Sequence, residues 1–223
     1  MKIMKPHART LALLALLITV VAVFVLGVIT YQRHERDASS RLLAVHSQRL
    51  VRMHAAVAGP QDAPVTIVEF FDPACETCRA FHPIVKDLLR QYPKEVRLVV
   101  RYAPFHPGSD DVVRLLEAAK RQGKYWEVLD MVLAAQPLWA DHGQPDVGKA
   151  YAAAAQTGLN LEQALADAAS AGIESVLRQD IEDLTALGVN KTPTFFVNGQ
   201  SLPSFGEEPL RRLVAEEVAR AQR

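Results

Sequence analysis

The chain contains 223 residues, of which 25 are lysine or arginine and 25 are aspartate or glutamate, so its formal net charge is zero. Because domains usually run to about 100 to 200 residues, this length accommodates one ordinary domain with additional segments. The balanced charge gives no support for nucleic-acid binding or for a strongly acidic partner. The only two cysteines are Cys75 and Cys78, which excludes a separate structural disulfide and a four-cysteine zinc site.

The N-terminal region carries a long uncharged stretch, residues 11–30, which could cross a bilayer as a helix, since about 20 residues are needed. It is a transmembrane anchor or a signal peptide. An uncleaved anchor is favoured because a secretory apolar region is usually about 7 to 15 residues long and ends in a small-x-small cleavage site. Residues 1–10 include Lys2, Lys5 and Arg9, which predicts a cytoplasmic leader. The chain would then be a single-pass protein of the cytoplasmic (inner) membrane, with its main domain facing the periplasm or the cell exterior.

Residues 31–58 are predicted to form a helical spacer between the membrane and the main domain. They are rich in charge, lack glycine and carry apolar residues at loosely helical spacing. A helix that self-associates is the alternative interpretation. Gly59 and Pro60 interrupt the pattern and predict the start of the main domain, 59–223.

A strand, two cysteines and a helix follow one another near the start of this domain. Residues 65–71 are β-branched or aromatic except for Glu69, and they predict a buried strand. From Phe81 onward the apolar residues recur on one helical face. Cys75 and Cys78 therefore lie where the strand has ended and the helix begins, and a helix N-terminus stabilises a thiolate. Such a pair can exist as dithiol or disulfide and can exchange with the thiols of other proteins.

The rest of the chain combines further strands with a long helical region. Residues 96–102 predict a second strand, parallel to the first because a helix connects them. Residues 109–187 are rich in alanine, leucine and charge, and they predict an inserted helical subdomain. A strand at 194–197 and an amphipathic helix at 211–222 complete the predicted elements.

The stretch NKTPTFFVNG, which ends at Gly199, resembles the segment in which thioredoxin-like proteins carry a cis-proline beside their cysteines. Together with the order of strand, C-x-x-C and helix and with the long helical region, it resembles the DsbA-like thiol-disulfide oxidoreductases of the thioredoxin superfamily, in a membrane-anchored form. The resemblance covers residues 59–223 and implies an α/β thioredoxin fold with a helical insertion at 109–187. It also implies a cis peptide between Thr192 and Pro193.

The same resemblance assigns roles to individual residues. Cys75 is expected to be the attacking thiol and Cys78 the resolving thiol. Glu69 matches an acid that lies under the active site of DsbA-like proteins and aids proton transfer, and burial would raise the pKa of its carboxyl. Thr192 and Pro193 are expected to lie against the disulfide and to present backbone to an extended substrate.

The dipeptide between the cysteines, Glu76-Thr77, differs from the Pro-His of DsbA and supplies no imidazole that could hold the thiolate. The Glu76 carboxylate is expected to raise the pKa of Cys75 by like-charge repulsion, although it also suits a helix N-terminus, and Arg79 supplies an opposing charge. A thiolate less stabilised than that of DsbA predicts a reduction potential between those of thioredoxin and DsbA.

The predicted function is that of an extracytoplasmic protein thiol-disulfide oxidoreductase, an enzyme whose redox group is the Cys75-Cys78 disulfide and which needs no further cofactor or metal. Its partners would be cysteine-containing extracytoplasmic proteins and a DsbB-like or DsbD-like membrane protein that resets the pair. The oxidase, reductase and isomerase directions stay open. One alternative is a thioredoxin-fold copper chaperone, since Cu(I) prefers thiolates and His82 lies four residues after Cys78. Another is a holdase that uses the helical insertion.

Overall fold

The computed structural model describes residues 48–141 and 143–223. The predicted leader at 1–10, the predicted anchor at 11–30 and most of the predicted spacer lie outside the described residues. Within the described part of the chain, no helix is both long enough and apolar enough to cross a membrane.

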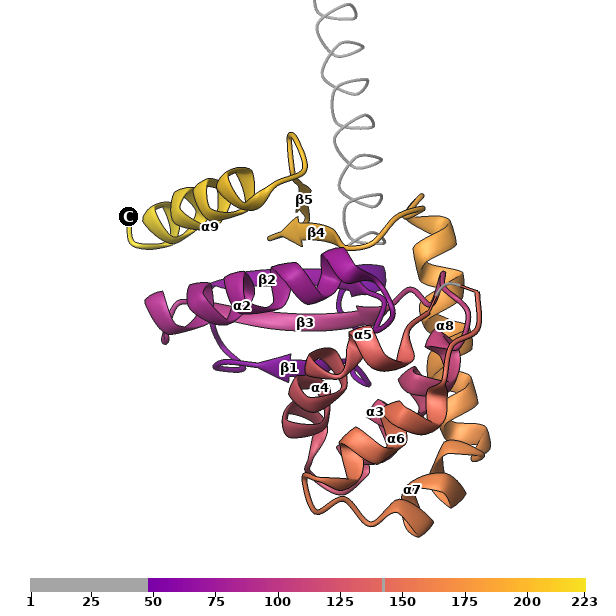
Figure 1. Ribbon diagram of the computed structural model, residues 1–223. Helices are drawn as coiled ribbons and strands as arrows, with labels where there is room; N and C mark the ends of the chain where they lie inside the picture. The colour runs from indigo at the N-terminus through magenta and orange to yellow at the C-terminus, as the bar shows by residue number, and fades with distance from the viewer. Residues whose placement is uncertain (1–47, 142) are drawn as a thin grey trace, which may run out of the picture. The chain divides into compact units, whose positions relative to one another are not determined.

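Five strands form one mixed sheet in the order β1-β3-β2-β4-β5 (Figure 1). They are β1 (Ala56–Ala58), β2 (Val65–Phe71), β3 (Val96–Tyr102), β4 (Thr194–Val197) and β5 (Gln200–Ser201). β2 and β3 run parallel, with Glu69 opposite Val100 and Phe71 opposite Tyr102, and the other pairs are antiparallel. The two central strands have their predicted bounds, and their parallel pairing follows from the crossover through helix α2 (Glu76–Gln91).

β2 and β3 are apolar along most of their length because both faces of the sheet are covered. On one face, Ile67 and Phe71 belong to a large core that includes side chains of α2 and of the C-terminal helix α9 (Glu207–Ala221). On the other face, Val68 and Phe70 pack with Leu50 and with residues at the end of helix α8 (Ala171–Ala186). Helix α2 therefore rests on the larger of the two cores.

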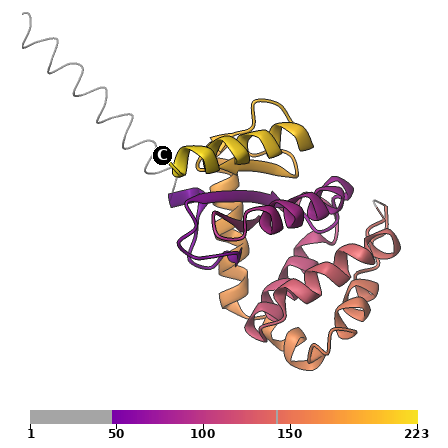
Figure 2. The same ribbon diagram turned by 90° about the vertical axis from the view of Figure 1, so that its left-hand side faces the viewer.

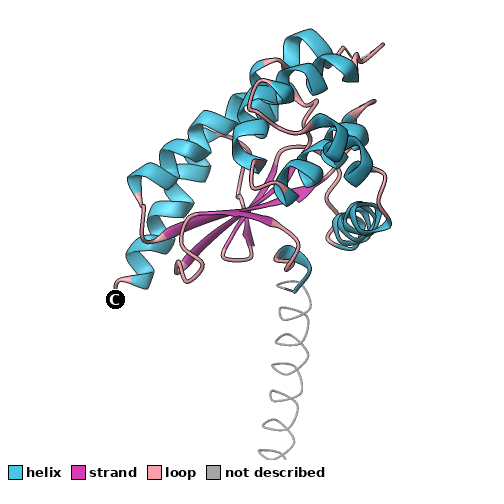
Figure 3. Ribbon diagram, turned by 90° about the horizontal axis from the view of Figure 1, so that it is seen from below, coloured by secondary structure: helices cyan, strands magenta, loops and turns pink. Residues whose placement is uncertain are grey.

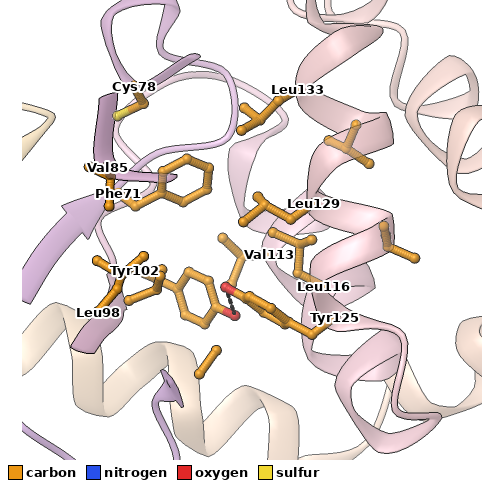
Figure 4. Packing of buried hydrophobic residues seen from close by; sticks show 14 of the residues in the cluster. Phe71, Cys78, Val85, Leu98, Tyr102, Val113, Leu116, Tyr125, Leu129 and Leu133 are labelled. Carbon is orange, nitrogen blue, oxygen red and sulfur yellow. Dashed lines mark hydrogen bonds between the residues drawn. The ribbon is translucent and has the colours of Figure 1, made fainter. Parts of the chain in front are cut away.

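The predicted helical insertion at 109–187 is confirmed. It contains α3 (Ser109–Arg121), α4 (Tyr125–Ala134), α5 (Gln136–Trp139), α6 (Val147–Ala155), α7 (Leu161–Ala168) and α8. In Figure 2, α9 (yellow) lies apart from α3 to α7, although all of these helices contribute side chains to the larger core. Figure 3 distinguishes the strands, in magenta, from the helices around them. In Figure 4, Val113 and Leu116 of α3 and Leu129 of α4 lie beside Phe71 and Tyr102 of the sheet. The insertion thus completes the core on the face that carries α2.

The C-terminal helix α9 begins at Glu207, four residues before the predicted start at residue 211. The carboxylates of Glu207 and Glu208 suit the positive end of a helix dipole, and Pro209 is tolerated in the first turn because its missing N–H needs no partner there.

The predicted boundary between a helical spacer at residues 31–58 and a domain that starts at residue 59 is wrong, because the last residues of the predicted spacer belong to the domain. β1 pairs with β3, and the Leu50 side chain is buried in the second core. Residues 55–58 carry no charge, and pairing with β3 satisfies their backbone polar groups. Gly59 marks a turn inside the domain, because its φ is 96° and a Cβ there would lie 2.7 Å from the carbonyl oxygen of Val96.

A buried ion-pair cluster ties the segment before β1 to the sheet and to α8. The guanidinium of Arg101 on β3 lies 2.7 Å from Asp180 and 2.8 Å from Asp183, both on α8. Arg52 reaches Asp183 at 2.7 Å, and His54 Nε2 lies 2.7 Å from Asp180. Burial acts to raise the pKa of the Asp183 carboxyl, but hydrogen bonds from Arg52 and Arg101 outweigh it and hold this pKa below its usual range.

Candidate active site

The turn between β2 and α2 places the two cysteines at the start of a helix. Cys75 is the N-cap residue of α2 in an extended conformation, and its carbonyl accepts the first helical hydrogen bond from Arg79. Cys78 lies in the first turn, where its side chain is fully buried, and both cysteines are free thiols. The backbone N–H of Asp72 donates to the Cys78 sulfur at 3.4 Å. The predicted placement of both cysteines where the strand has ended and the helix begins is confirmed.

The Cys75 thiol is strongly acidic. Its pKa is lowered to about 5, chiefly by the hydrogen bond from the Cys78 side chain. Partial burial opposes this effect, while the side chain of Thr192 and the backbone of Cys78 and Thr77 add further hydrogen bonds to the thiolate. Glu76 is exposed, and the raising effect expected from its carboxylate stays a prediction. Hydrogen-bond donors in the active-site turn thus take the place of the missing imidazole.

The Cys78 thiol behaves in the opposite way. Burial raises its pKa far above the usual range, and its hydrogen bond to Cys75 and the negative charge of Glu69 act in the same direction. One cysteine is therefore a thiolate at neutral pH, whereas its neighbour keeps its proton until a base removes it.

The Glu69 carboxyl lies beneath this pair, as its predicted burial requires. It points to the face of β2 that carries α2, and only 4% of the residue is exposed. Desolvation and the nearby Cys75 thiolate raise its pKa to about 8. Among the described residues, none donates a hydrogen bond to its buried Oε1. A carboxyl in this setting can gain or lose a proton close to neutral pH.

The predicted cis peptide between Thr192 and Pro193 is confirmed, and it lies against Cys75. The Cys75 thiol donates to the carbonyl oxygen of Thr192 at 3.4 Å across 117 residues of sequence. The chain reaches this position because β4, which follows, pairs with β2. Phe195 of β4 packs on Phe81 of α2, with ring centroids 5.4 Å apart.

Asp72 is a site residue that the sequence pattern did not reveal, because an aspartate in a Pro-containing turn needs no further explanation. Its buried carboxylate accepts hydrogen bonds from the backbone N–H of Phe105 at 2.7 Å and of His106 at 3.0 Å. The His106 ring Nδ1 lies 2.7 Å from the same carboxylate, and the Ser109 hydroxyl also donates to it. Asp72 thereby fixes the loop after β3 beside the cysteine turn.

The copper-binding set imagined from Cys75, Cys78 and His82 is not assembled. His82 Nε2 lies 2.6 Å from the carboxylate of Asp130 on α4. Within residues 48–141 and 143–223, no group of three or more histidine, cysteine or acidic side chains could hold a metal ion.

The fold and the site define a thioredoxin-fold protein with a reactive dithiol. Residues 53–216 match the family described as thioredoxin, and the chain belongs to this family.

The chain is also similar to several known proteins. It is 35% identical over 147 residues to the Na⁺/H⁺ antiporter NhaA of Herminiimonas arsenicoxydans, a match that covers 66% of this chain and 22% of that protein. The chain thus spans about a fifth of the length of the curated relatives it matches.

Among solved structures, a thioredoxin-like oxidoreductase from Silicibacter pomeroyi DSS-3 is 29% identical, with a TM-score of 0.66 over 76% of this chain and 94% of the other. BdbD from Bacillus subtilis is 21% identical, with a TM-score of 0.67 over 74% and 94% of the two chains. The catalytic domain of Proteus mirabilis ScsC is 19% identical, with a TM-score of 0.67 over 80% and 98%. These likenesses show a thioredoxin-like fold, which fits the mixed α/β sheet and the helical insertion described above.

Proposed function

We propose that the chain is an extracytoplasmic protein thiol-disulfide oxidoreductase that works through Cys75 and Cys78. The main support for this proposal is that the pKa values of the two thiols are shifted in opposite directions. The pKa of Cys75 is lowered to about 5, and that of Cys78 is raised far above its usual value. A thiolate is the form that attacks a disulfide, and a buried thiol beside it is suited to resolve the product. The solved structure described as a thioredoxin-like oxidoreductase supports the same activity.

In the reducing direction, the Cys75 thiolate attacks one sulfur of a substrate disulfide, forms a mixed disulfide and releases the other substrate sulfur as a thiolate. The mixed disulfide removes the negative charge of Cys75, which is one of the two causes of the raised Glu69 pKa, so the Glu69 carboxyl can release its own proton to solvent. The Glu69 carboxylate then takes the proton from Cys78, whose thiolate attacks the Cys75 sulfur. The products are the Cys75-Cys78 disulfide and a substrate with both sulfurs reduced. The oxidising direction is the reverse of these steps, with Glu69 returning the proton to Cys78.

The position of Thr192 and Pro193 beside Cys75 supports a role for these two residues in substrate binding. The Thr192 carbonyl already contacts the Cys75 sulfur, so an extended peptide that approaches this sulfur passes the same backbone. Proline has no N–H and leaves neighbouring backbone groups free to pair with the peptide.

The proposed setting is the outer side of the cytoplasmic membrane, where oxidising conditions make protein disulfides persistent. Cysteine-containing exported proteins would be the substrates, and a DsbB-like or DsbD-like membrane protein would reset the pair. The pKa of Cys75, about 5, falls between about 3.5 for DsbA and about 7 for thioredoxin. A reduction potential between about −270 and −120 mV is therefore expected.

The test measures the redox equilibrium of the Cys75-Cys78 pair in glutathione buffers together with the reduction of a disulfide-bonded test protein. The Cys75→Ser variant should lose exchange, and the Cys78→Ser variant should accumulate mixed disulfides with the substrate. Ser204→Ala, an exposed change distant in sequence from both cysteines, serves as the control. Exchange by the Cys75→Ser variant at the wild-type rate, or a wild-type pair that never equilibrates with glutathione, would overturn the proposal.

A further inference from the structure

One side chain of the helical insertion holds the backbone on both sides of the reactive cysteine. Gln136, the first residue of α5, is 1% exposed. Its Nε2 donates to the carbonyl oxygen of Pro73 at 2.7 Å and to that of Cys75 at 3.0 Å. These contacts bridge 63 and 61 residues of sequence, so the insertion and the cysteine turn meet at this amide.

The orientation of the amide follows from its two partners. Both are carbonyl oxygens, so only the NH₂ group can face the turn, and the amide oxygen must point elsewhere. That Oε1 is buried, and no group of the described residues donates to it. An unpaired buried acceptor costs stability that an apolar side chain of the same size would not. The two hydrogen bonds that Gln136 donates to the cysteine turn are the interactions that an apolar side chain of the same size could not make.

The position of Gln136 is fixed by its neighbours on α5. The Trp139 indole is fully buried and donates to the carbonyl of Val132 at 2.9 Å. The Ala140 N–H closes the turn by donating to the carbonyl of Gln136 at 2.9 Å. The short helix is therefore held against α4, and the amide cannot move away from the cysteine turn without disturbing a buried tryptophan.

These contacts bear on the charge of the reactive sulfur. The carbonyl oxygens of Pro73 and Cys75 carry partial negative charges beside the Cys75 side chain, and the Cys75 carbonyl also accepts the N–H of Arg79. The positive end of the Gln136 amide dipole neutralises part of that negative potential. We propose that Gln136 is a positioning residue that stabilises the Cys75 thiolate through the backbone of the cysteine turn. The inference rests on the proposed function, because it concerns the sulfur that performs the exchange.

The test compares Gln136→Met, which fills the same space without a donor, with Gln136→Glu, which replaces the amide by a carboxylate. Gln156→Met, on an exposed glutamine of the same insertion, is the matched control. Thiolate formation is followed by absorbance at 240 nm against pH, and the redox equilibrium is measured in glutathione buffers, with circular dichroism to confirm folding.

Gln136→Met should destabilise the Cys75 thiolate and make the disulfide less oxidising. The glutathione equilibrium should shift by about fivefold, which is the scale of one hydrogen bond. This fold-change corresponds to about 21 mV at 29.6 mV per tenfold. Gln136→Glu should shift it further in the same direction, because a carboxylate adds negative charge. The control should match the wild type. Folded variants whose thiolate titration and equilibrium both equal those of the wild type would overturn the inference.

A measurement on the wild-type chain covers the case in which both variants fail to fold. The side-chain ¹⁵N resonance of Gln136 should shift with the same apparent pKa as the Cys75 thiol, and a resonance unaffected by that titration would refute the link. If the wild type shows the titration but exchanges no disulfide, the proposed function fails while the role of Gln136 stands.

Discussion

The Glu69→Gln substitution should remove a large pH dependence from the stability of the reduced protein. The carboxyl ionises near pH 4.5 in the unfolded chain and near pH 8 in the folded one, because burial disfavours its charge. Between these values the folded state holds a proton that the unfolded state has lost, so the free energy of unfolding falls as pH rises. At about 1.4 kcal/mol per pH unit, the total loss approaches about 5 kcal/mol, an upper bound because proteins relax around buried charges.

Urea unfolding of the reduced protein at pH 4.5, 6, 7 and 9 would measure this effect. The stability of Glu69→Gln relative to the wild type should rise with pH and level off above about pH 8, since glutamine never ionises. Glu162→Gln removes an exposed carboxylate of the insertion and is the control, with the pH profile of the wild type. Parallel profiles for the wild type and Glu69→Gln would refute the buried, proton-holding carboxyl. The same variant should resolve mixed disulfides at least about tenfold more slowly at pH 7, because Cys78 loses its base.

Three further predictions concern the surroundings of the site. Asp183→Asn should lower the free energy of unfolding by about 3 to 5 kcal/mol in urea titrations, because it leaves the buried Arg101 with an incomplete set of partners; a loss below about 1 kcal/mol would contradict this. Asp72→Asn should cost about 1 to 3 kcal/mol and raise hydrogen exchange in the loop after β3, since an amide nitrogen cannot accept the bonds that the carboxylate accepts, and unchanged exchange would count against its role. Glu76→Gln should lower the pKa of Cys75 by only a few tenths in an absorbance titration, because an exposed charge is screened by solvent; a drop of a full unit would restore Glu76 as the main control.

The sequence predicted well those features that depend on local patterns. The bounds of β2 and β3 follow from unbroken apolar runs, and the cysteines lie at a helix start because a strand and an amphipathic helix flank them. The cis peptide before Pro193 could be predicted because the stretch around it resembles a known segment, which a physical pattern alone would not have shown. The insertion was predicted from its alanine-rich helical spacing, since helices depend mostly on neighbouring residues.

Features that depend on contacts between distant segments were missed. Arg101 occurs in an apolar strand without any nearby partner in sequence, and its two aspartates come from a helix 79 and 82 residues later. The main cause of the acidity of Cys75 was not identified, because the charge of Glu76 is visible in the sequence, whereas the hydrogen bonds from Cys78 and Thr192 depend on the folded turn and on how the chain folds back. Gln136 carries no local signal at all, since a glutamine between two helices usually faces solvent.

The long separation along the chain between the cysteines and their neighbours has a consequence for protein synthesis. Cys75 is made 117 residues before Thr192, which at a rate of about 5 to 20 residues per second corresponds to roughly 6 to 23 s of translation. During that interval β2 has no β4 beside it, and the two thiols are part of a growing chain that cannot yet form the completed site. In a redox protein built in this order, the surroundings that determine the reactivity of the two cysteines are complete only after most of the chain has been translated.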